Sequence, residues 1–115
     1  MRLDFENLAG HRITGVCFIH DYIEITFDVA ILRCLTLPVL NRGGADIRPG
    51  DSTYEKRMVE MLHSRVSKTR VVEGAQMTMN FGDSCSISIS LKEIDKINGE
   101  AAHFVSLDSG ILDVF

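Results

Sequence analysis

A hydrophobic pattern that occurs twice constrains the fold of this chain more than any other feature. Apolar and polar side chains alternate over residues 23–37, and the same pattern returns over residues 77–91, with Arg33 as the only break in the match. The matched apolar positions are Ile23, Ile25, Phe27, Ile31, Leu35 and Leu37 in the first copy, and Met77, Met79, Phe81, Cys85, Ile89 and Leu91 in the second. Alternation of this kind is typical of β-strands. Each copy therefore predicts a hairpin, with turns at Asp28-Val29 and Gly82-Asp83.

Length and charge limit the class of protein. A chain of 115 residues is expected to fold as one domain, residues 1–115. The net charge of −4 disfavours a nucleic-acid partner or an anionic membrane, because neutralisation of phosphates supplies most of such affinity, and it suits a basic protein partner. No run approaches the ~20 apolar residues that span a bilayer, and residues 1–6 show no signal peptide. We therefore expect a cytoplasmic protein that does not enter a membrane.

The cysteines and histidines show no catalytic or metal-binding spacing. Three cysteines are odd in number, lie in strand-like runs and form no C-x-x-C motif. They are Cys17, Cys34 and Cys85, and we expect buried, free thiols in a reducing compartment. The histidines are His11, His20, His63 and His103, and no pair has the spacing of metal ligands. The sequence predicts neither a metal site nor a cofactor.

Residues 53–65 give the strongest helix signal. Tyr54, Met58, Met61 and Leu62 fall on one helical face. Residues 52–55 read Ser-Thr-Tyr-Glu, which matches a capping box. We expect one amphipathic helix from about Thr53 to Arg65.

Further strands are expected over residues 13–19, 66–72, 75–81, 101–107 and 111–115, which are rich in β-branched and aromatic residues or alternate in polarity. The predicted fold class is α+β. It consists of a mostly antiparallel sheet of about six to eight strands, built from two similar hairpin units, with the helix at about residues 53–65 packed on one face.

The second strand of the first hairpin is apolar on both faces. Ala30, Leu32 and Cys34 stand where the second copy has Ser84, Ser86 and Ser88. A strand of this kind is usually covered on both sides. We expect a helix or a second subunit to cover Leu32 and Cys34, which makes them a candidate interface in a homodimer.

Residues 41–50 contain three glycines and a proline and are expected to form a long irregular loop. Such loops often carry function. Loop amides ahead of a helix can hold an anion, helped here by Arg42 or Arg48, although Asp46 and Asp51 would repel a phosphate. The candidate residues for a partner or ligand are Arg42, Gly43, Gly44, Asp46, Arg48 and Asp51.

Several turn and strand signals resemble those of small, uncharacterised bacterial families in which a helix lies between two hairpins. The residues that carry the resemblance are Gly10-His11-Arg12-Ile13, Phe27-Asp28 and Phe81-Gly82. Some proteins of this type serve as immunity partners of toxins. The resemblance implies a two-hairpin α+β fold and a partner-binding role, and it transfers no functional residue.

Two hypotheses about function follow. The first is a non-catalytic binding protein that acts through a protein partner or as a homodimer. The alternative is a small enzyme whose site is assembled from several strands, for example with His20 or His103 near Cys34. A pocket that joins a thiol to an imidazole would favour the enzyme.

Overall fold

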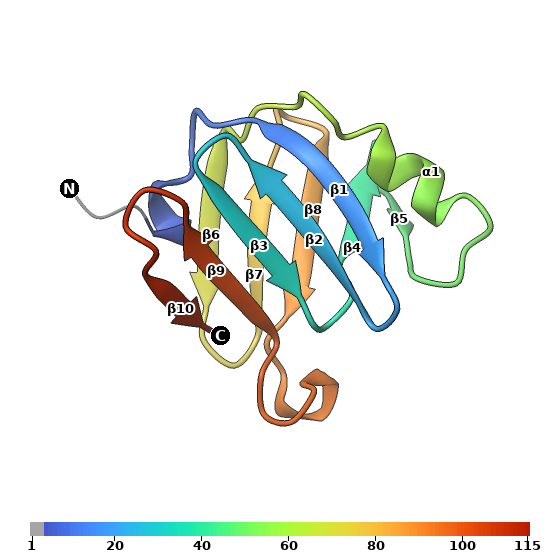
Figure 1. The fold of residues 1–115 in the computed structure, drawn as a ribbon. Coiled ribbons are helices and arrows are strands. Elements are labelled where there is room, and N and C mark those ends of the chain that lie inside the picture. Colours follow the sequence, from blue (N-terminus) through green and yellow to red (C-terminus); the bar gives the residue numbers. More distant parts are fainter. Residues whose placement is uncertain (1–3) are drawn as a thin grey trace.

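The computed structural model describes residues 4–115, which form two antiparallel five-stranded sheets packed face to face (Figure 1). The strand order is β1-β2-β3-β9-β10 in the first sheet, called sheet 1, and β5-β4-β8-β7-β6 in the second, called sheet 2. Strands account for 47% of the residues and helices for 11%, and no helix reaches seven residues in the described part. The predicted α+β class, with a single sheet under one main helix, is therefore wrong, and the fold is mostly β.

The elements have the following bounds. Sheet 1 contains β1 (Ile13–Ile19), β2 (Tyr22–Phe27), β3 (Ala30–Cys34), β9 (Ala102–Ser106) and β10 (Leu112–Val114). Sheet 2 contains β4 (Val39–Arg42), β5 (Ala45–Ile47), β6 (Lys68–Val72), β7 (Gln76–Asn80) and β8 (Cys85–Ser90). The helical elements are the 3-10 turns η1 (Phe5–Asn7) and η2 (Glu93–Asp95) and the short helix α1 (Tyr54–Val59).

The repeated pattern does form two hairpins, β2–β3 and β7–β8, but they lie in different sheets. Their registers also differ. Ile23 pairs with Cys34, whereas Met77 pairs with Ile89, so the second hairpin is one residue longer between these partners. A shift of one residue exchanges the two faces of a strand. The sequence match beyond the turn is therefore out of register.

This shift decides which face of β3 is buried. Ala30, Leu32 and Cys34 are fully buried in the core, while Ile31 and Arg33 lie on the outer face of sheet 1. The buried face is covered by sheet 2 of the same chain. Leu32 and Cys34 therefore expose no area to a second subunit, and the prediction that they form an interface is wrong.

The predicted helix over residues 53–65 is wrong in extent, because α1 ends at Val59. His63 adopts a φ of 72°, and its N–H donates to the Ile13 carbonyl at 2.8 Å. Backbone pairing with the start of β1 thus replaces the last helical turn. The apolar stripe is nevertheless buried at Tyr54, Met58 and Met61. The capping box does not form, since Thr53 is the N-cap and its side chain makes no cap hydrogen bond.

The core is one cluster between the sheets, closed at one side by α1 and near the chain ends by aromatic packing. Phe5 meets Phe104 and Phe115 edge to face, with ring centroids 6.1 Å apart in both pairs. No helix of residues 4–115 has the length and apolar character that crossing a bilayer requires.

Candidate functional site

The predicted loop at residues 41–50 is mostly a hairpin. Strands β4 and β5 pair from Leu40–Ile47 to Arg42–Ala45, which leaves Gly43 and Gly44 as a two-residue turn. Their φ values are 60° and 86°, and a type I′ hairpin turn requires positive φ at both positions. The glycines therefore specify a tight turn instead of irregular chain, and the loop prediction is wrong for this part.

The remainder of that segment is a short turn that leads to α1. The Arg48 N–H donates to Asp51 Oδ2 at 2.7 Å, and the Asp51 N–H donates to the Arg48 carbonyl at 3.0 Å. Asp51 thus has a structural partner within the turn. The side chains of Arg48 and Asp46 also pair, at 2.9 Å.

The structure divides the six candidate residues among three shallow hollows and the turn. Gly43 and Gly44 line a hollow of about 450 Å³ with Asn41 and residues 82–86. Arg42 lines an adjoining hollow of about 330 Å³ with Glu60. Asp46 and Arg48 line a third, of about 280 Å³, near Lys92 and Asp95. Asp51 lines none of the three. The candidates therefore do not converge on one site.

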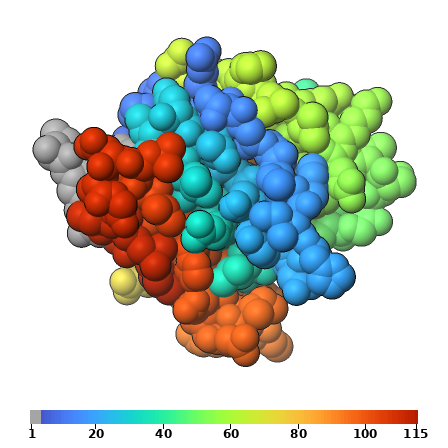
Figure 2. Space-filling view, in the orientation of Figure 1, coloured from blue at the N-terminus to red at the C-terminus, as the bar shows by residue number. Residues whose placement is uncertain are grey.

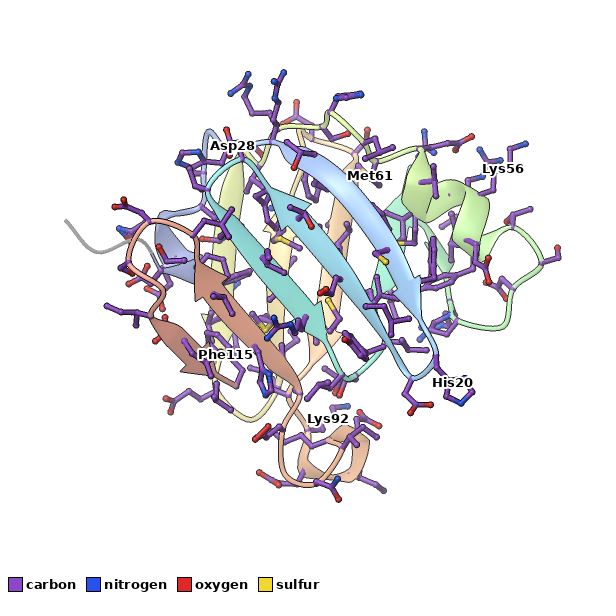
Figure 3. All side chains as sticks on the ribbon, in the orientation of Figure 1. His20, Asp28, Lys56, Met61, Lys92 and Phe115 are labelled. Atoms are coloured by element: carbon purple, nitrogen blue, oxygen red, sulfur yellow. The ribbon has the colours of Figure 1, made fainter. Side chains whose placement is uncertain are left out.

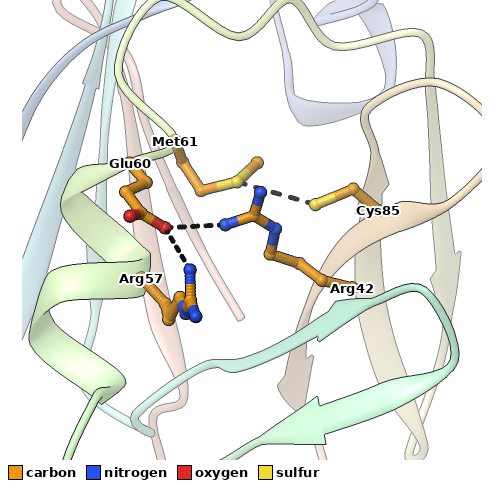
Figure 4. A network of polar contacts seen from close by, with 5 residues as sticks. All are labelled: Arg42, Arg57, Glu60, Met61 and Cys85. Atoms are coloured by element: carbon orange, nitrogen blue, oxygen red, sulfur yellow. Dashed lines mark hydrogen bonds and ion pairs between the residues drawn. The ribbon is translucent and has the colours of Figure 1, made fainter.

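The first two hollows meet beside a network of charged side chains (Figure 4). Arg42 Nη1 donates to Glu60 Oε1 at 2.8 Å, and Arg57 Nη1 donates to the same oxygen at 2.9 Å. The hydrogen bond from Arg57 is the main cause that holds the pKa of the Glu60 carboxyl below its usual value. Burial acts in the opposite direction, and the hydrogen bond from Arg42 and the charges of both arginines add to the lowering. The network ties β4 to α1. Because its members are partly exposed, each ion pair contributes little to stability.

Cys85 lies at the junction of these two hollows, and its Sγ contacts Met61 Sδ at 3.6 Å. Burial raises the pKa of the Cys85 thiol, although the charge of Arg42 acts in the opposite direction. The thiol is therefore protonated at neutral pH, and a protonated thiol is a poor nucleophile.

The structure also separates the thiol and imidazole groups of the enzyme hypothesis. Burial strongly raises the pKa of Cys34, whose side chain faces the core. His103 of β9 lies opposite Arg33 of β3 in the strand register, so its side chain is on the outer face of sheet 1. Its Nε2 lies 2.7 Å from Glu100 Oε2. His20 lies at the tip of the β1–β2 hairpin and points into solvent (Figure 3). Of the three thiols expected to be buried, only Cys34 is buried, whereas Cys85 is partly buried and Cys17 is exposed.

Residues 4–115 contain no group of three or more His, Cys, Asp or Glu side chains that could hold a metal ion. The outer face of sheet 2 carries uncharged polar side chains on β7 and β8, whereas β6 places Lys68 and Arg70 on the same face. Ser86, Ser88 and Ser90 of β8 alternate with the buried Ile87 and Ile89, as predicted. Thr78 Oγ1 and Ser88 Oγ lie 3.3 Å apart across β7 and β8.

The sequence pattern did not predict one apolar surface of the protein. On the outer face of sheet 1, Leu112 pairs with Val105, and Val105 pairs with Ile31. Val114 continues this apolar area along β10, and Leu107 follows β9 at the start of the β9–β10 turn. We call these five residues the β10 surface: Ile31, Val105, Leu107, Leu112 and Val114. Leu107 and Val114 are each 53% exposed, and Leu112 is 49% exposed. The segment that contains β9 and β10, red in Figure 2, lies on the same face as β3, and β9 is the strand next to β3.

No protein-family model, curated protein or solved structure matches this chain. The resemblance to toxin-immunity-like families therefore stays a prediction.

Proposed function

We propose that this chain is a non-catalytic binding protein that contacts a protein partner through the β10 surface. The observation that carries the proposal is the apolar area shared by three adjacent strands. Exposed apolar area costs about 25 cal/mol per Å² in water, so contiguous apolar side chains on a sheet face often mark an interface. Three of the five side chains are about half exposed and open to contact.

The surroundings of the thiol groups give less support to the alternative that this chain is an enzyme. The thiols at Cys34 and Cys85 have raised pKa values, and His103 lies on the opposite face of sheet 1 from Cys34. A nucleophile needs an activating base within hydrogen-bond reach. In the described residues, neither of these two thiols has an imidazole partner.

We propose the cytoplasm as the location of the protein. The three cysteines are free, and a reducing compartment keeps thiols in that state. Thiol alkylation in fresh host extract checks this. All three cysteines should react after denaturation without prior reduction, whereas a requirement for reductant would contradict the proposal.

The binding role is tested by comparing two variants as baits in quantitative affinity capture from the host. Leu112→Asp places a charge in the β10 surface. Ile94→Asp makes the same kind of change on η2, where Ile94 is 90% exposed. We expect Leu112→Asp to lose a partner that the unaltered chain and Ile94→Asp both retain. Equal capture by all three baits would contradict the proposal.

A further inference from the structure

We propose that the partner of the β10 surface is a basic protein, whose contact area is apolar and bordered by lysine or arginine side chains. This inference rests on the proposed binding role of the same surface. It identifies the chemistry of the partner and argues against a second copy of this chain as the occupant.

Acidic side chains border the β10 surface. Asp108 directly follows Leu107 in the β9–β10 turn, and both are exposed. Asp4 is the N-cap of η1, and Glu6 lies within η1. Both line a hollow of about 290 Å³ together with Val114, Phe115 and two neighbours. The apolar strip therefore ends in carboxylates at the turn and at the hollow, which gives a partner's cations two places to lie.

The basic side chains of this face already have acidic neighbours. Arg33 Nε lies 3.7 Å from Glu24 Oε2, and His103 Nε2 lies 2.7 Å from Glu100 Oε2. These groups therefore do not offset the carboxylates at the border. Complementary charge around an apolar centre is a common arrangement in protein interfaces, and it selects against like-charged partners.

A second copy fits this surface poorly. In a two-fold contact the same patch meets itself, so each acidic border would approach either an apolar area or another acidic border. Like charges placed opposite each other are unfavourable. A basic partner has no such conflict, and the net charge of −4 adds a long-range attraction to it.

The test uses three fluorescein-labelled heptapeptides with alternating residues: lysine and leucine, glutamate and leucine, or lysine and serine. Fluorescence anisotropy measures their binding to the full chain. We expect the lysine–leucine peptide to bind at least about tenfold more tightly than the other two. Its affinity should fall as salt rises from about 20 mM to about 300 mM, because exposed charge attraction is screened.

Two charge-reversal pairs separate a local effect from a general one. Glu6→Lys with Asp108→Lys reverses the border of the β10 surface. Glu73→Lys with Asp83→Lys makes the same total change at exposed turns of sheet 2. We expect only the first pair to shift the preference toward the glutamate–leucine peptide. Equal effects of both pairs, or no binding of any peptide at about 1 mM, would overturn the inference.

A third variant keeps the two proposals distinguishable. We expect Leu112→Ser to weaken the binding of the lysine–leucine peptide in proportion to the lost apolar contact. If Leu112→Ser weakens both leucine peptides and these bind equally, the binding role stands and the basic partner does not. If Leu112→Ser changes nothing, the binding role itself fails. A dimer in light scattering that Leu112→Ser dissociates would make a second copy the occupant and overturn the inference.

Discussion

At the scale of single residues, Ser106 is the clearest local conflict in the fold. Its side chain faces the core opposite Ala30, it is 1% exposed, and its Oγ has no hydrogen-bond partner among residues 4–115. A buried hydroxyl without a partner costs free energy because its hydration is lost and not replaced. An alanine at position 106 would have no hydroxyl and would therefore avoid this cost.

We therefore expect Ser106→Ala to raise the free energy of unfolding by about 1 kcal/mol. Urea denaturation followed by circular dichroism measures the change. Ser88→Ala serves as a comparison, since Ser88 Oγ lies within hydrogen-bond distance of Thr78 Oγ1 and should give no gain when removed. A loss of stability in Ser106→Ala would show that the hydroxyl is bonded in the folded protein.

The sequence identified single residues well where local pattern decides their environment. The alternation in β8 correctly placed its serines outside and its isoleucines inside. It failed where the environment depends on the position of a strand in the sheet. Leu112 and Val114 alternate like buried residues, but β10 is an edge strand and their side chains lie on an outer face. Likewise, the contact of Arg42 with Glu60 joins elements that no local pattern connects.

At the scale of elements, turn geometry explains the largest difference between the predicted and the observed candidate site, which is the β4–β5 hairpin in place of an irregular loop. Three glycines and a proline within ten residues indicate irregular chain if glycine is treated only as a breaker of structure. Two adjacent glycines are also the preferred residues of a type I′ hairpin, and the strands on either side are too short to reveal themselves by alternation. The helix prediction failed for a related reason, since backbone pairing of residues 63–66 with residues 10–13, which lead into β1, overrides helical periodicity.

The hairpin turn predicts a measurable difference between two glycine-to-alanine variants. Gly44 has a φ of 86°, and a side chain there strains the backbone although no atom lies within 4 Å of the added Cβ. We expect Gly44→Ala to lower the free energy of unfolding by about 1–2 kcal/mol. Gly15 lies in β1 without a positive φ, and its added Cβ would meet Thr26 Cβ at an ordinary 3.5 Å.

Gly15→Ala should therefore leave stability nearly unchanged. Thermal or urea unfolding of both variants measures the contrast. If the two substitutions have equal effects, then backbone strain at the β4–β5 turn is not what requires glycine there.

At the scale of the whole molecule, the sequence indicated two amphipathic hairpins but not how they combine. Two such hairpins bury the same apolar face whether they lie side by side in one sheet under a helix or face each other in two sheets. The choice here follows from long-range pairing. β3 pairs with β9, and β8 pairs with β4, so each hairpin lies at or near the middle of its own sheet. No periodicity within a hairpin contains that information.

This arrangement separates residues that stabilise the fold from residues that are open to a partner. Leu32 lies at the centre of sheet 1 and is fully buried against the core, whereas Leu112 is 49% exposed on its outer face. We expect Leu32→Ala to lower the free energy of unfolding by about 2–5 kcal/mol, because a buried cavity replaces packed methyl groups. Leu112→Ala should lower it by less than about 0.5 kcal/mol.

Urea denaturation of both variants gives the two free energies, and light scattering gives the oligomeric state. Leu32→Ala should leave the molar mass of the folded protein unchanged, because the cavity forms inside a single chain. A small stability loss together with dissociation of an oligomer would instead show that Leu32 meets a second subunit, and it would contradict the packing of sheet 1 against sheet 2. The opposite pattern, with stability lost and mass unchanged, assigns the buried face of β3 to the core and leaves the outer face of sheet 1 for recognition.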